Sequence, residues 1–433
     1  MAFNKSIAEE LRERLPSHID VNTFHSKGLR VLLSNFRIKP KINENKCFVI
    51  GKKILDTKDM DVKQQIRYLF EIQIIWNYIR VNLITDYEKE IPGICIEKNI
   101  EFQERMVGDM EQIRNAWHKE MKKINSVKEI NIDFTDMLYF PYQLLDSEDF
   151  PKYDIVTLDE QQDANTLQKE LALRYIKKSG RFVVVGDSRQ CIYGFQGSSL
   201  EVFKSLQSYP NTIVLPLDIT YRCGKNIVEE ARKVFNNGIV AAPNAIDGIV
   251  RKGEFDEAEN GDFILCRNNL PLATVFLYLL EMGKKATIKG KDYGDALVAL
   301  VDKIKHIEDL DAMCERKISE LKERGFTDIQ AKNNPSYVTL LEKCTILEML
   351  YKNWGDMKKL EDNIKEIYKD DTEGIVLSTI HKSKGLEADR VFLLNRSLIP
   401  SKYANTEEAL YNEKCLLFVA ITRARKEFVY CNV

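Results

Sequence analysis

The chain has 433 residues, and its 64 Lys and Arg against 66 Asp and Glu give a formal net charge of −2. The length predicts about two to four domains. Hydrophobic residues make up 44% of the chain, and this content excludes a disordered or collagen-like protein. No uncharged apolar run approaches the roughly 20 residues that cross a bilayer, and residues 1–10 hold no apolar signal core. We therefore expect a cytoplasmic protein with no membrane partner. The nine cysteines form no CxxC pair, which predicts free thiols in a reducing compartment.

The first extended feature is a polar, helix-rich stretch over residues 35–130. Within it, residues 64–83 have apolar side chains at helical spacing. We expect amphipathic helices that pack as a small bundle on a neighbouring sheet.

A buried strand is predicted over residues 154–158, followed at once by an acidic cluster, and residues 167–177 then show a helical pattern. In open parallel sheets, ligands bind beyond the carboxyl ends of the strands, which is where the cluster falls. Asp159 could hold Mg²⁺ on a nucleotide there, and Glu160 could orient or deprotonate an attacking water. A solvated acidic loop is the alternative interpretation of this stretch.

A second strand is predicted over residues 182–185, and a loop with Gln190, Tyr193 and Phe195 follows it. The Gln190 amide could contact a phosphate or the attacking water. The two aromatic rings could stack on bases, at roughly 1–3 kcal/mol for each stacked base. Taken alone, two aromatic residues after a strand are also typical of a core.

The second half of the chain repeats the strand–helix alternation. Strands are predicted over residues 212–217, 263–266, 375–379 and 390–394, with a helix starting near Gly224 and a terminal strand ending near residue 431. A polar stretch over residues 290–372 interrupts the series, and residues 298–325 within it form a second amphipathic helical pattern. The alternation predicts an α/β fold with parallel sheets and right-handed crossovers.

Two arginines in this half, Arg222 and Arg423, fall at strand or helix ends. From such positions a guanidinium can reach an anionic ligand with two hydrogen bonds. Single arginines are also common as plain surface charges.

Taken together and in order, these segments resemble the UvrD/Rep/PcrA family of superfamily 1 DNA helicases. DEQQD (159–163) looks like the Walker B motif, VVGDSRQCIYGFQGS (184–198) like the third motif, and TYRCGKNI (220–227) like the fourth. STIHKSKGLEADRVFLL (378–394) and FVAITRAR (418–425) look like the fifth and sixth motifs. FNKSIAEELRERL (3–15) and VNTFHSKGLRVL (21–32) resemble the two DNA-contacting motifs that follow the family's P-loop.

The resemblance implies a catalytic role for several of these residues. Asp159 would bind Mg²⁺, Glu160 would be the catalytic base, and Gln190 would couple the γ-phosphate to the DNA site. Arg222 and Arg423 would stabilise charge on the transferring phosphoryl group, with Arg423 acting as an arginine finger.

The same resemblance implies further contacts to ATP and DNA. Tyr221 would stack on adenine, and Glu387 would accept a hydrogen bond from the ribose. The residues implied along the single-strand path are Phe24, His25, Tyr193, Phe195, Thr379 and His381, with Asn4 and Lys5 near the DNA phosphates.

The implied fold has two RecA-like parallel-sheet domains, each with a helical insertion. The first comprises residues 1–34 and 131–210, with the insertion 35–130. The second comprises residues 211–289 and 373–433, with the insertion 290–372. The implied activity is ATP-dependent, Mg²⁺-requiring 3′-to-5′ translocation on single-stranded DNA, and the partners are single strands and single/double-strand junctions.

One family motif is not found in the 433 residues. Gly-Lys occurs four times and is followed by Lys, Asn, Lys and Asp, so no GxxxxGK[ST] phosphate-binding loop is present. We interpret the chain as a truncated or split helicase with impaired ATP binding on its own, in which an upstream segment or a second polypeptide supplies the P-loop. The alternative is a non-catalytic DNA-binding accessory protein. A third interpretation, the motor part of a helicase–nuclease, has no support from the sequence.

Overall fold

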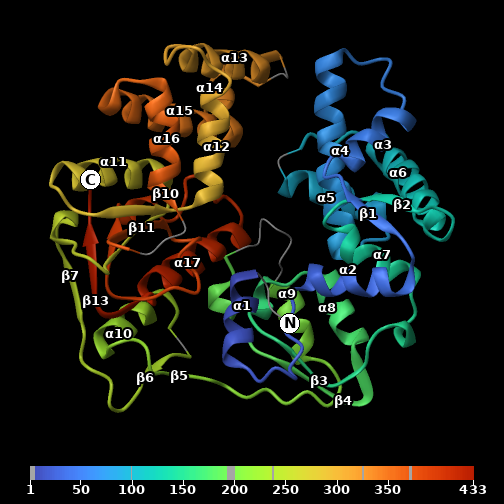
Figure 1. Cartoon of the computed structure of the whole chain (residues 1–433), viewed down its shortest axis with the longest axis horizontal. Helices are drawn as coiled ribbons and strands as arrows, with labels where there is room; N and C mark the ends of the chain where they lie inside the picture. The colour runs from blue at the N-terminus through green and yellow to red at the C-terminus, as the bar shows by residue number, and fades with distance from the viewer. Residues whose placement is uncertain (1–4, 99, 193–199, 237, 324–325, 370–372) are drawn as a thin grey trace. The chain divides into compact units, whose positions relative to one another are not determined.

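The computed structural model describes residues 5–433 except 99, 193–199, 237, 324–325 and 370–372. The chain divides into two compact units, Met1–Val214 and Leu215–Val433, which are described separately below (Figure 1). Within the described ranges, no helix combines the length and apolarity that a bilayer-spanning segment needs. All nine cysteines are buried and unpaired with one another by disulfides, as predicted.

The first unit is mostly helical. Its helices are α1 (Lys5–Arg14), α2 (Phe24–Asn35), α3 (Lys46–Ile54), α4 (Val62–Asn82), α5 (Tyr87–Glu97), α6 (Arg105–Lys122), α7 (Asp136–Leu144), α8 (Thr166–Arg174) and α9 (Leu200–Gln207). The helix predicted over residues 64–83 is confirmed as α4, which starts with a capping box between Asp61 and Gln64. The buried face of α4 packs on α3, α5 and α6, and the indole rings of Trp76 and Trp117 meet at 5.6 Å in its core.

Helix α2 is fixed by close packing against α7. Gly28 allows this approach, because a Cβ at this position would lie 2.3 Å from the carbonyl oxygen of Met137. Thr23 caps the start of α2 by accepting a hydrogen bond from the backbone N–H of Ser26. The start of α2 therefore has a fixed position relative to α7.

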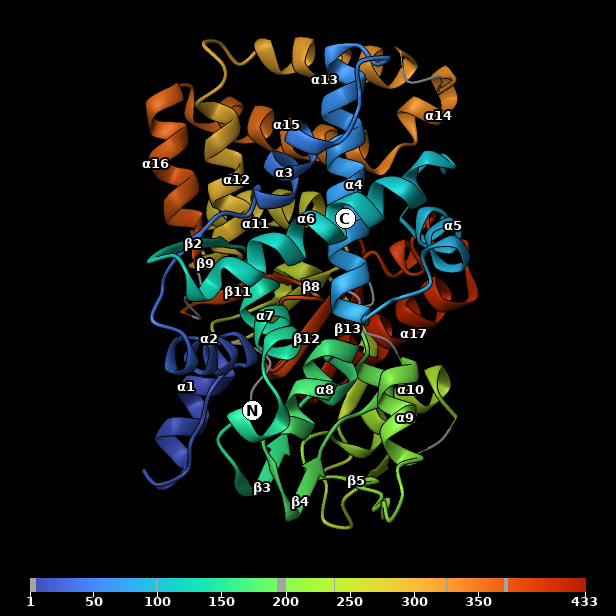
Figure 2. The same cartoon turned by 90° about the vertical axis from the view of Figure 1, so that its right-hand side faces the viewer.

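Two small parallel sheets complete the first unit. Strand β1 (Lys39–Ile42) pairs with β2 (Glu129–Ile132), and β3 (Tyr153–Leu158) pairs with β4 (Ile176–Val184). Figure 2 shows β3 and β4 side by side. The helix predicted over residues 167–177 is confirmed as α8, but it ends at Arg174 because β4 begins two residues later.

The continuous apolar runs that predict β3 and β4 favour strands buried on both faces of a parallel sheet, and this expectation is wrong. Ile155, Val183 and Val185 are 59%, 43% and 42% exposed, while Val156 and Leu158 are buried. Because side chains alternate along a strand, one face of this pair packs on the core and the other carries apolar side chains in the open. Parallel sheets usually have both faces covered.

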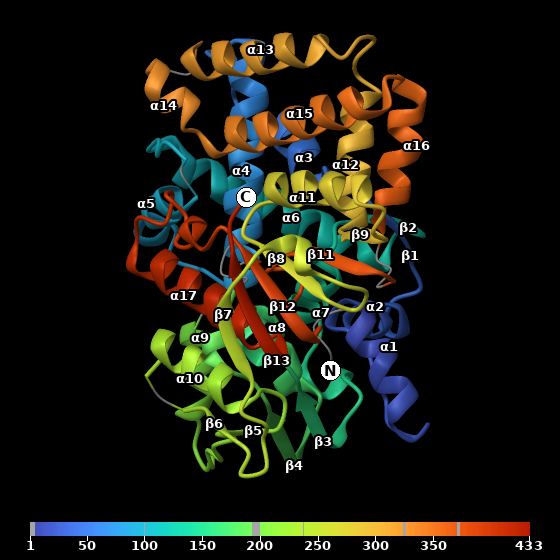
Figure 3. The same cartoon turned by 90° about the vertical axis from the view of Figure 1, so that its left-hand side faces the viewer.

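The second unit is built around a seven-stranded sheet. The strands are β7 (Ile249–Lys252), β8 (Phe263–Cys266), β9 (Ala286–Lys289), β10 (Tyr368–Lys369), β11 (Ile375–Thr379), β12 (Ala388–Leu394) and β13 (Ala424–Cys431). Their order is β10-β9-β11-β8-β12-β13-β7, and every pairing is parallel (Figure 3). A short pair, β5 (Ile219–Thr220) and β6 (Val240–Ala241), lies outside this sheet. The α/β fold class with parallel sheets is thus confirmed.

Helices connect and cover the strands of the second unit. They are α10 (Lys225–Val234), α11 (Asn269–Glu281), α12 (Lys291–Val301), α13 (Asp309–Glu323), α14 (Asp328–Lys332), α15 (Pro335–Trp354), α16 (Met357–Ile367) and α17 (Glu407–Ile421). The pattern over residues 298–325 corresponds to parts of α12 and α13, not to one helix. The strand predicted over residues 212–217 is wrong, since this segment has no ladder partner and Leu215 and Leu217 are 78% and 82% exposed.

Candidate nucleotide and DNA site

The acidic cluster of the first unit lies at the carboxyl ends of β3 and β4. The backbone N–H of Val185 donates to Leu158 O at 2.9 Å, and that of Gln161 donates to Val185 O at 3.0 Å. These bonds extend the pairing beyond the strands and hold Asp159 and Glu160 beside the loop that begins at Gly186. The two carboxylates therefore lie at the sheet edge where ligands bind.

Gln162 connects Glu160 to this second loop. Its Nε2 donates to Glu160 Oε2 at 2.5 Å, and its Oε1 accepts from the backbone N–H of Asp187 at 3.0 Å. Asp187 in turn accepts from Gln190 Nε2 at 3.1 Å. A continuous hydrogen-bonded chain thus joins the predicted base to Gln190, with Gln162 as a member that sequence reasoning did not assign.

The backbone around the acidic cluster is unusual. Glu160 has a φ of 52° in the left-handed region, which non-glycine residues seldom adopt. Gln161 is 1% exposed, and neither of its side-chain amide atoms has a hydrogen-bond partner among the residues that the structure describes. Strained backbone and unsatisfied buried polar atoms concentrate at functional sites.

The second unit brings together two of its predicted nucleotide residues, Arg222 and Glu387. Arg222 forms an ion pair with Glu387, and Arg425 Nη1 lies 3.4 Å from the same carboxylate. Two backbone hydrogen bonds hold the segments that carry these residues together. The N–H of Gly224 donates to Arg425 O and the N–H of Ala388 donates to Arg423 O, each at 3.0 Å. Segments from three motifs therefore meet in one place.

Tyr221 lies next to this cluster in sequence and is 80% exposed. Its ring is available for stacking in this unit. Arg425 was not among the predicted residues, although it is 44% exposed at its side chain and also pairs with Asp389 at 2.7 Å. The second arginine of the TRAR sequence was the signal that could have identified it.

Arg423 itself is only 2% exposed. Its guanidinium donates to the backbone carbonyls of Val419 at 3.1 Å and Leu386 at 3.0 Å. In this arrangement the side chain ties the end of α17 to the loop before β12. The predicted meeting of Arg222 and Arg423 with Glu160 and Gln190 involves both units, and it stays a prediction.

The predicted DNA contacts of the first unit fall on α2 and the motifs around it. Phe24 is 3% exposed and belongs to the hydrophobic core, so its ring is not a stacking surface here, in contrast to the prediction. His25 is partly exposed, and burial lowers its pKa below the usual value. Asn4, Tyr193 and Phe195 lie outside the described residues, and Lys5 begins α1.

A further aromatic residue lies beside His25. The rings of His25 and Phe134 are 6.4 Å apart at an interplanar angle of 87°, and Phe134 is 51% exposed. A large exposed ring next to a predicted DNA-contacting residue suits base stacking. Sequence reasoning missed Phe134 because an aromatic residue after a short strand usually predicts core.

In the second unit, Thr379 ends β11 and His381 lies in the turn that follows. The backbone N–H of Lys382 donates to Thr379 O at 3.0 Å, which fixes this turn. Burial, together with the charge of Arg267, lowers the pKa of His381 to about 4. Both side chains are partly exposed at the carboxyl end of the sheet.

An acid pair at strand ends, an arginine–glutamate cluster, and the partly exposed His25 beside the exposed Phe134 thus lie on two units with parallel strands. Two family models match the chain, the UvrD/REP helicase N-terminal domain over residues 1–210 and the UvrD-like helicase C-terminal domain over residues 111–431. The chain belongs to the UvrD/Rep family of DNA helicases.

Individual relatives agree with this assignment. The ATP-dependent DNA helicase Rep of Buchnera aphidicola is 20% identical over 580 residues, which cover 100% of this chain and 87% of Rep. The F-box DNA helicase protein 1 of Schizosaccharomyces pombe is 26% identical over 69% of this chain, which spans 37% of that protein. The ATP-dependent DNA helicase PcrA of Bacillus subtilis is 27% identical over 55% of this chain, which spans 33% of it.

Proposed function

We propose that the chain is the motor part of an ATP-dependent DNA helicase that translocates 3′ to 5′ on single-stranded DNA. The hydrogen-bonded chain from Glu160 through Gln162 and Asp187 to Gln190 carries this proposal. It joins the predicted catalytic base to the loop that leads to Tyr193 and Phe195. Such a connection allows DNA binding to change the geometry of ATP hydrolysis.

The residues present suit a Mg²⁺–nucleotide complex. Asp159 offers a carboxylate at a strand end, and hard oxygen ligands are those that Mg²⁺ prefers. Arg222 offers a guanidinium to phosphate oxygens, and the 80% exposed ring of Tyr221 offers a stacking face. Bound Mg²⁺–ATP would supply the phosphoryl group, and Glu160 would orient and deprotonate the water that attacks it.

The DNA path of the first unit would include the partly exposed His25 and the exposed Phe134, together with Tyr193 and Phe195. Stacking on aromatic rings tolerates any base sequence, as a translocating motor requires. Contacts from Lys and Arg to phosphates would make binding weaker at high salt. Junctions between single and double strands are the proposed physiological substrates.

We further propose that ATP turnover needs a phosphate-binding segment in addition to residues 1–433. The open apolar face of β3 and β4, with Ile155 59% exposed, is a surface that an additional strand and helix would cover. Within the described part of the chain, the buried amide of Gln161, which follows β3, has no hydrogen-bond partner and offers both a donor and an acceptor. The segment would belong to a longer form of this chain or to a second polypeptide.

One observation favours a second function, that of a non-catalytic DNA-binding accessory protein. The guanidinium of Arg423 is buried and bonded to backbone carbonyls, so it is not offered to a phosphate in this arrangement. An accessory protein would keep the DNA path without turning over ATP.

Strand displacement on tailed duplexes tests the leading function. With Mg²⁺ and ATP, and with a phosphate-binding segment present, a 3′-tailed duplex should be unwound and a 5′-tailed duplex should not. DNA binding without unwinding of either substrate would instead support the accessory protein.

A further inference from the structure

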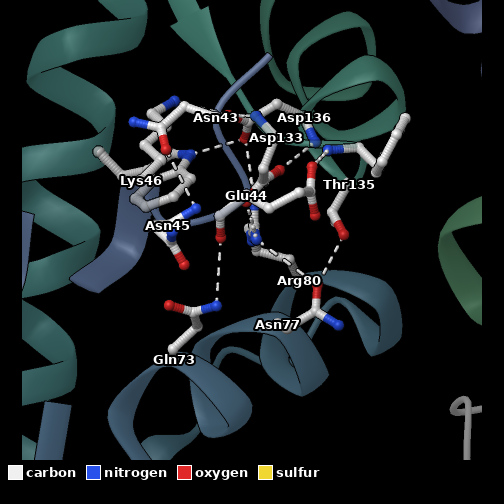
Figure 4. Close-up of polar contacts among 12 residues, drawn as sticks. Asn43, Glu44, Asn45, Lys46, Gln73, Asn77, Arg80, Asp133, Thr135 and Asp136 are labelled. Atoms are coloured by element: carbon white, nitrogen blue, oxygen red, sulfur yellow. Dashed lines mark hydrogen bonds and ion pairs between the residues drawn. The ribbon is translucent and has the colours of Figure 1, made fainter. Parts of the chain in front are cut away.

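We infer that helix α4 positions the exposed ring of Phe134, beside His25, through three polar side chains on one of its faces, Gln73, Asn77 and Arg80. The spacing of these residues places them on the same side of the helix. The inference rests on the proposed DNA-binding function and adds a role for the helical insertion in it. Figure 4 shows the three side chains pointing toward the segments around residues 43–46 and 133–136.

Arg80 makes the central contact. Its Nη1 and Nη2 donate to the two carboxylate oxygens of Asp133 at 2.9 and 2.6 Å, and Nη1 also donates to Asp136 Oδ1 at 2.8 Å. Arg80 is 2% exposed and Asp136 is 0% exposed, so these ion pairs are buried (Figure 4). A planar guanidinium that binds both oxygens of a carboxylate fixes direction as well as distance.

The two aspartates that Arg80 binds close the turn that carries Phe134. The backbone N–H of Asp136 donates to Asp133 Oδ1 at 2.8 Å, and that of Asp133 donates to Asp136 Oδ2 at 3.3 Å. Lys46 Nζ and Trp117 Nε1 hold Asp136 from other sides, at 2.5 and 2.8 Å. The conformation of the turn is therefore set by groups from the helical insertion.

Two more contacts from α4 attach the flanks of the same turn. Asn77 Oδ1 accepts a hydrogen bond from Thr135 Oγ1 at 2.6 Å, and Gln73 Nε2 donates to Glu44 O at 3.2 Å. The carboxylate of Glu44 then accepts from the backbone N–H of Phe134 itself at 2.9 Å. Phe134, whose ring is exposed, is thus held through its own backbone N–H and through its neighbour Thr135.

The chemistry of this cluster indicates positioning, not simple stabilisation. Burying two cations and two carboxylates costs desolvation that apolar side chains of similar volume would avoid. What charged groups supply in return is directional bonding. Here the bonds end on the turn whose exposed ring lies 6.4 Å from the ring of His25.

The test measures binding of a fluorescently labelled oligo(dT) to the full chain at fixed salt. The variants are Asn77→Ala and Arg80→Lys, each alone and combined with Phe134→Ala, because a lysine keeps the charge but cannot bind Asp133 with two donors. The control is Asn82→Ala on the same helix, whose side chain donates to the carbonyl of Tyr78 and to no other residue among those described. Far-ultraviolet circular dichroism confirms that each variant is folded, and 2-aminopurine fluorescence reports stacking directly.

We expect Phe134→Ala to weaken binding about tenfold, as for the loss of one base stack. Asn77→Ala and Arg80→Lys should each weaken binding severalfold and reduce 2-aminopurine quenching, yet add nothing once Phe134 is replaced, because they act through its ring. Effects that add to those of Phe134→Ala, or unchanged affinity, would overturn the inference while the proposed function stands. Failure of the unaltered chain to bind DNA would overturn both.

Discussion

The side-chain amide of Gln162 donates to the carboxylate of Glu160, with 2.5 Å between Nε2 and Oε2. The other amide atom of Gln162 accepts from the backbone of the next loop, so this one side chain spans the ends of β3 and β4. Gly186 makes room for it, because a Cβ there would lie 2.6 Å from Gln162 Oε1. The position of the predicted catalytic base therefore depends on the loop that leads to the predicted DNA-contacting residues Tyr193 and Phe195.

Replacing Gln162 tests this dependence. Gln162→Ala should lower the DNA-stimulated kcat for ATP hydrolysis by roughly tenfold to a hundredfold, because a positioned base contributes about a hundredfold to ten-thousandfold and the variant keeps the base but loses part of its positioning. The KM for ATP should change little, since Gln162 does not contact phosphates in this account. Steady-state kinetics at saturating DNA, with a phosphate-binding segment present, would measure both. An unchanged kcat would show that Glu160 is positioned without Gln162.

Arg425 should contribute to nucleotide binding together with Arg222. Both arginines pair with Glu387 on the surface of the second unit, where an exposed ion pair is worth at most about 1 kcal/mol. Phosphate oxygens can therefore displace the carboxylate at little cost. We expect Arg425→Ala to weaken binding of a fluorescent ATP analogue severalfold, and Lys426→Ala, the matched neighbour, to leave it unchanged. Equal binding by both variants would remove Arg425 from the site.

His381 should make stability depend on pH. Burial lowers its pKa from 6.5 to about 4, so the unfolded chain takes up a proton at a higher pH than the folded chain does. The stability contributed by the neutral imidazole is complete above pH 6.5 and is lost as the pH falls toward 4, by up to about 3 kcal/mol at roughly 1.4 kcal/mol per unit. Thermal melts between pH 4 and 7 should show a smaller loss for His381→Gln than for the unaltered chain. An equal loss of melting temperature in the two proteins over this pH range would contradict a role for His381.

The contact of α2 with α7 should be intolerant of even one methyl group. Gly28→Ala places a Cβ 2.3 Å from Met137 O and 2.9 Å from a Leu138 methyl carbon, and should destabilise by about 1–3 kcal/mol. Gly108→Ala is the matched control in α6, where a Cβ meets nothing within 4 Å. It should be neutral or stabilise by up to about 1 kcal/mol. Urea unfolding curves for the two variants would separate these outcomes.

The sequence was sufficient to locate strands and helices where the local pattern of apolar residues agrees with their burial in the fold. Continuous apolar runs located β8 and β11, both with buried apolar side chains, and helical spacing located α4. The apolar run at 212–217 predicted a strand equally well, but strand formation needs a partner, and pattern alone does not supply one. For the same reason the open face of β3 and β4 could not be foreseen.

Site residues could be predicted where they belong to a recognisable motif. They could not be predicted where tertiary packing determines whether a side chain is buried or exposed. Motif resemblance indicated Glu160, Arg222 and Glu387. It gave no signal that the ring of Phe24 is turned into the core while Phe134 is exposed, because both are aromatic residues beside short polar segments. The role of Gln162 depends on a backbone N–H from another strand end, which only the fold brings near.

The most direct test of a DNA-driven motor that needs an added phosphate-binding segment is ATP hydrolysis with and without single-stranded DNA. Residues 1–433 should be measured alone and with such a segment added, with Glu160→Gln as the inactive control. We predict DNA-stimulated hydrolysis only with the segment present, and a rate at least about a thousandfold lower without it, because several kcal/mol of positioning are missing. Full DNA-stimulated activity of residues 1–433 alone would contradict the account.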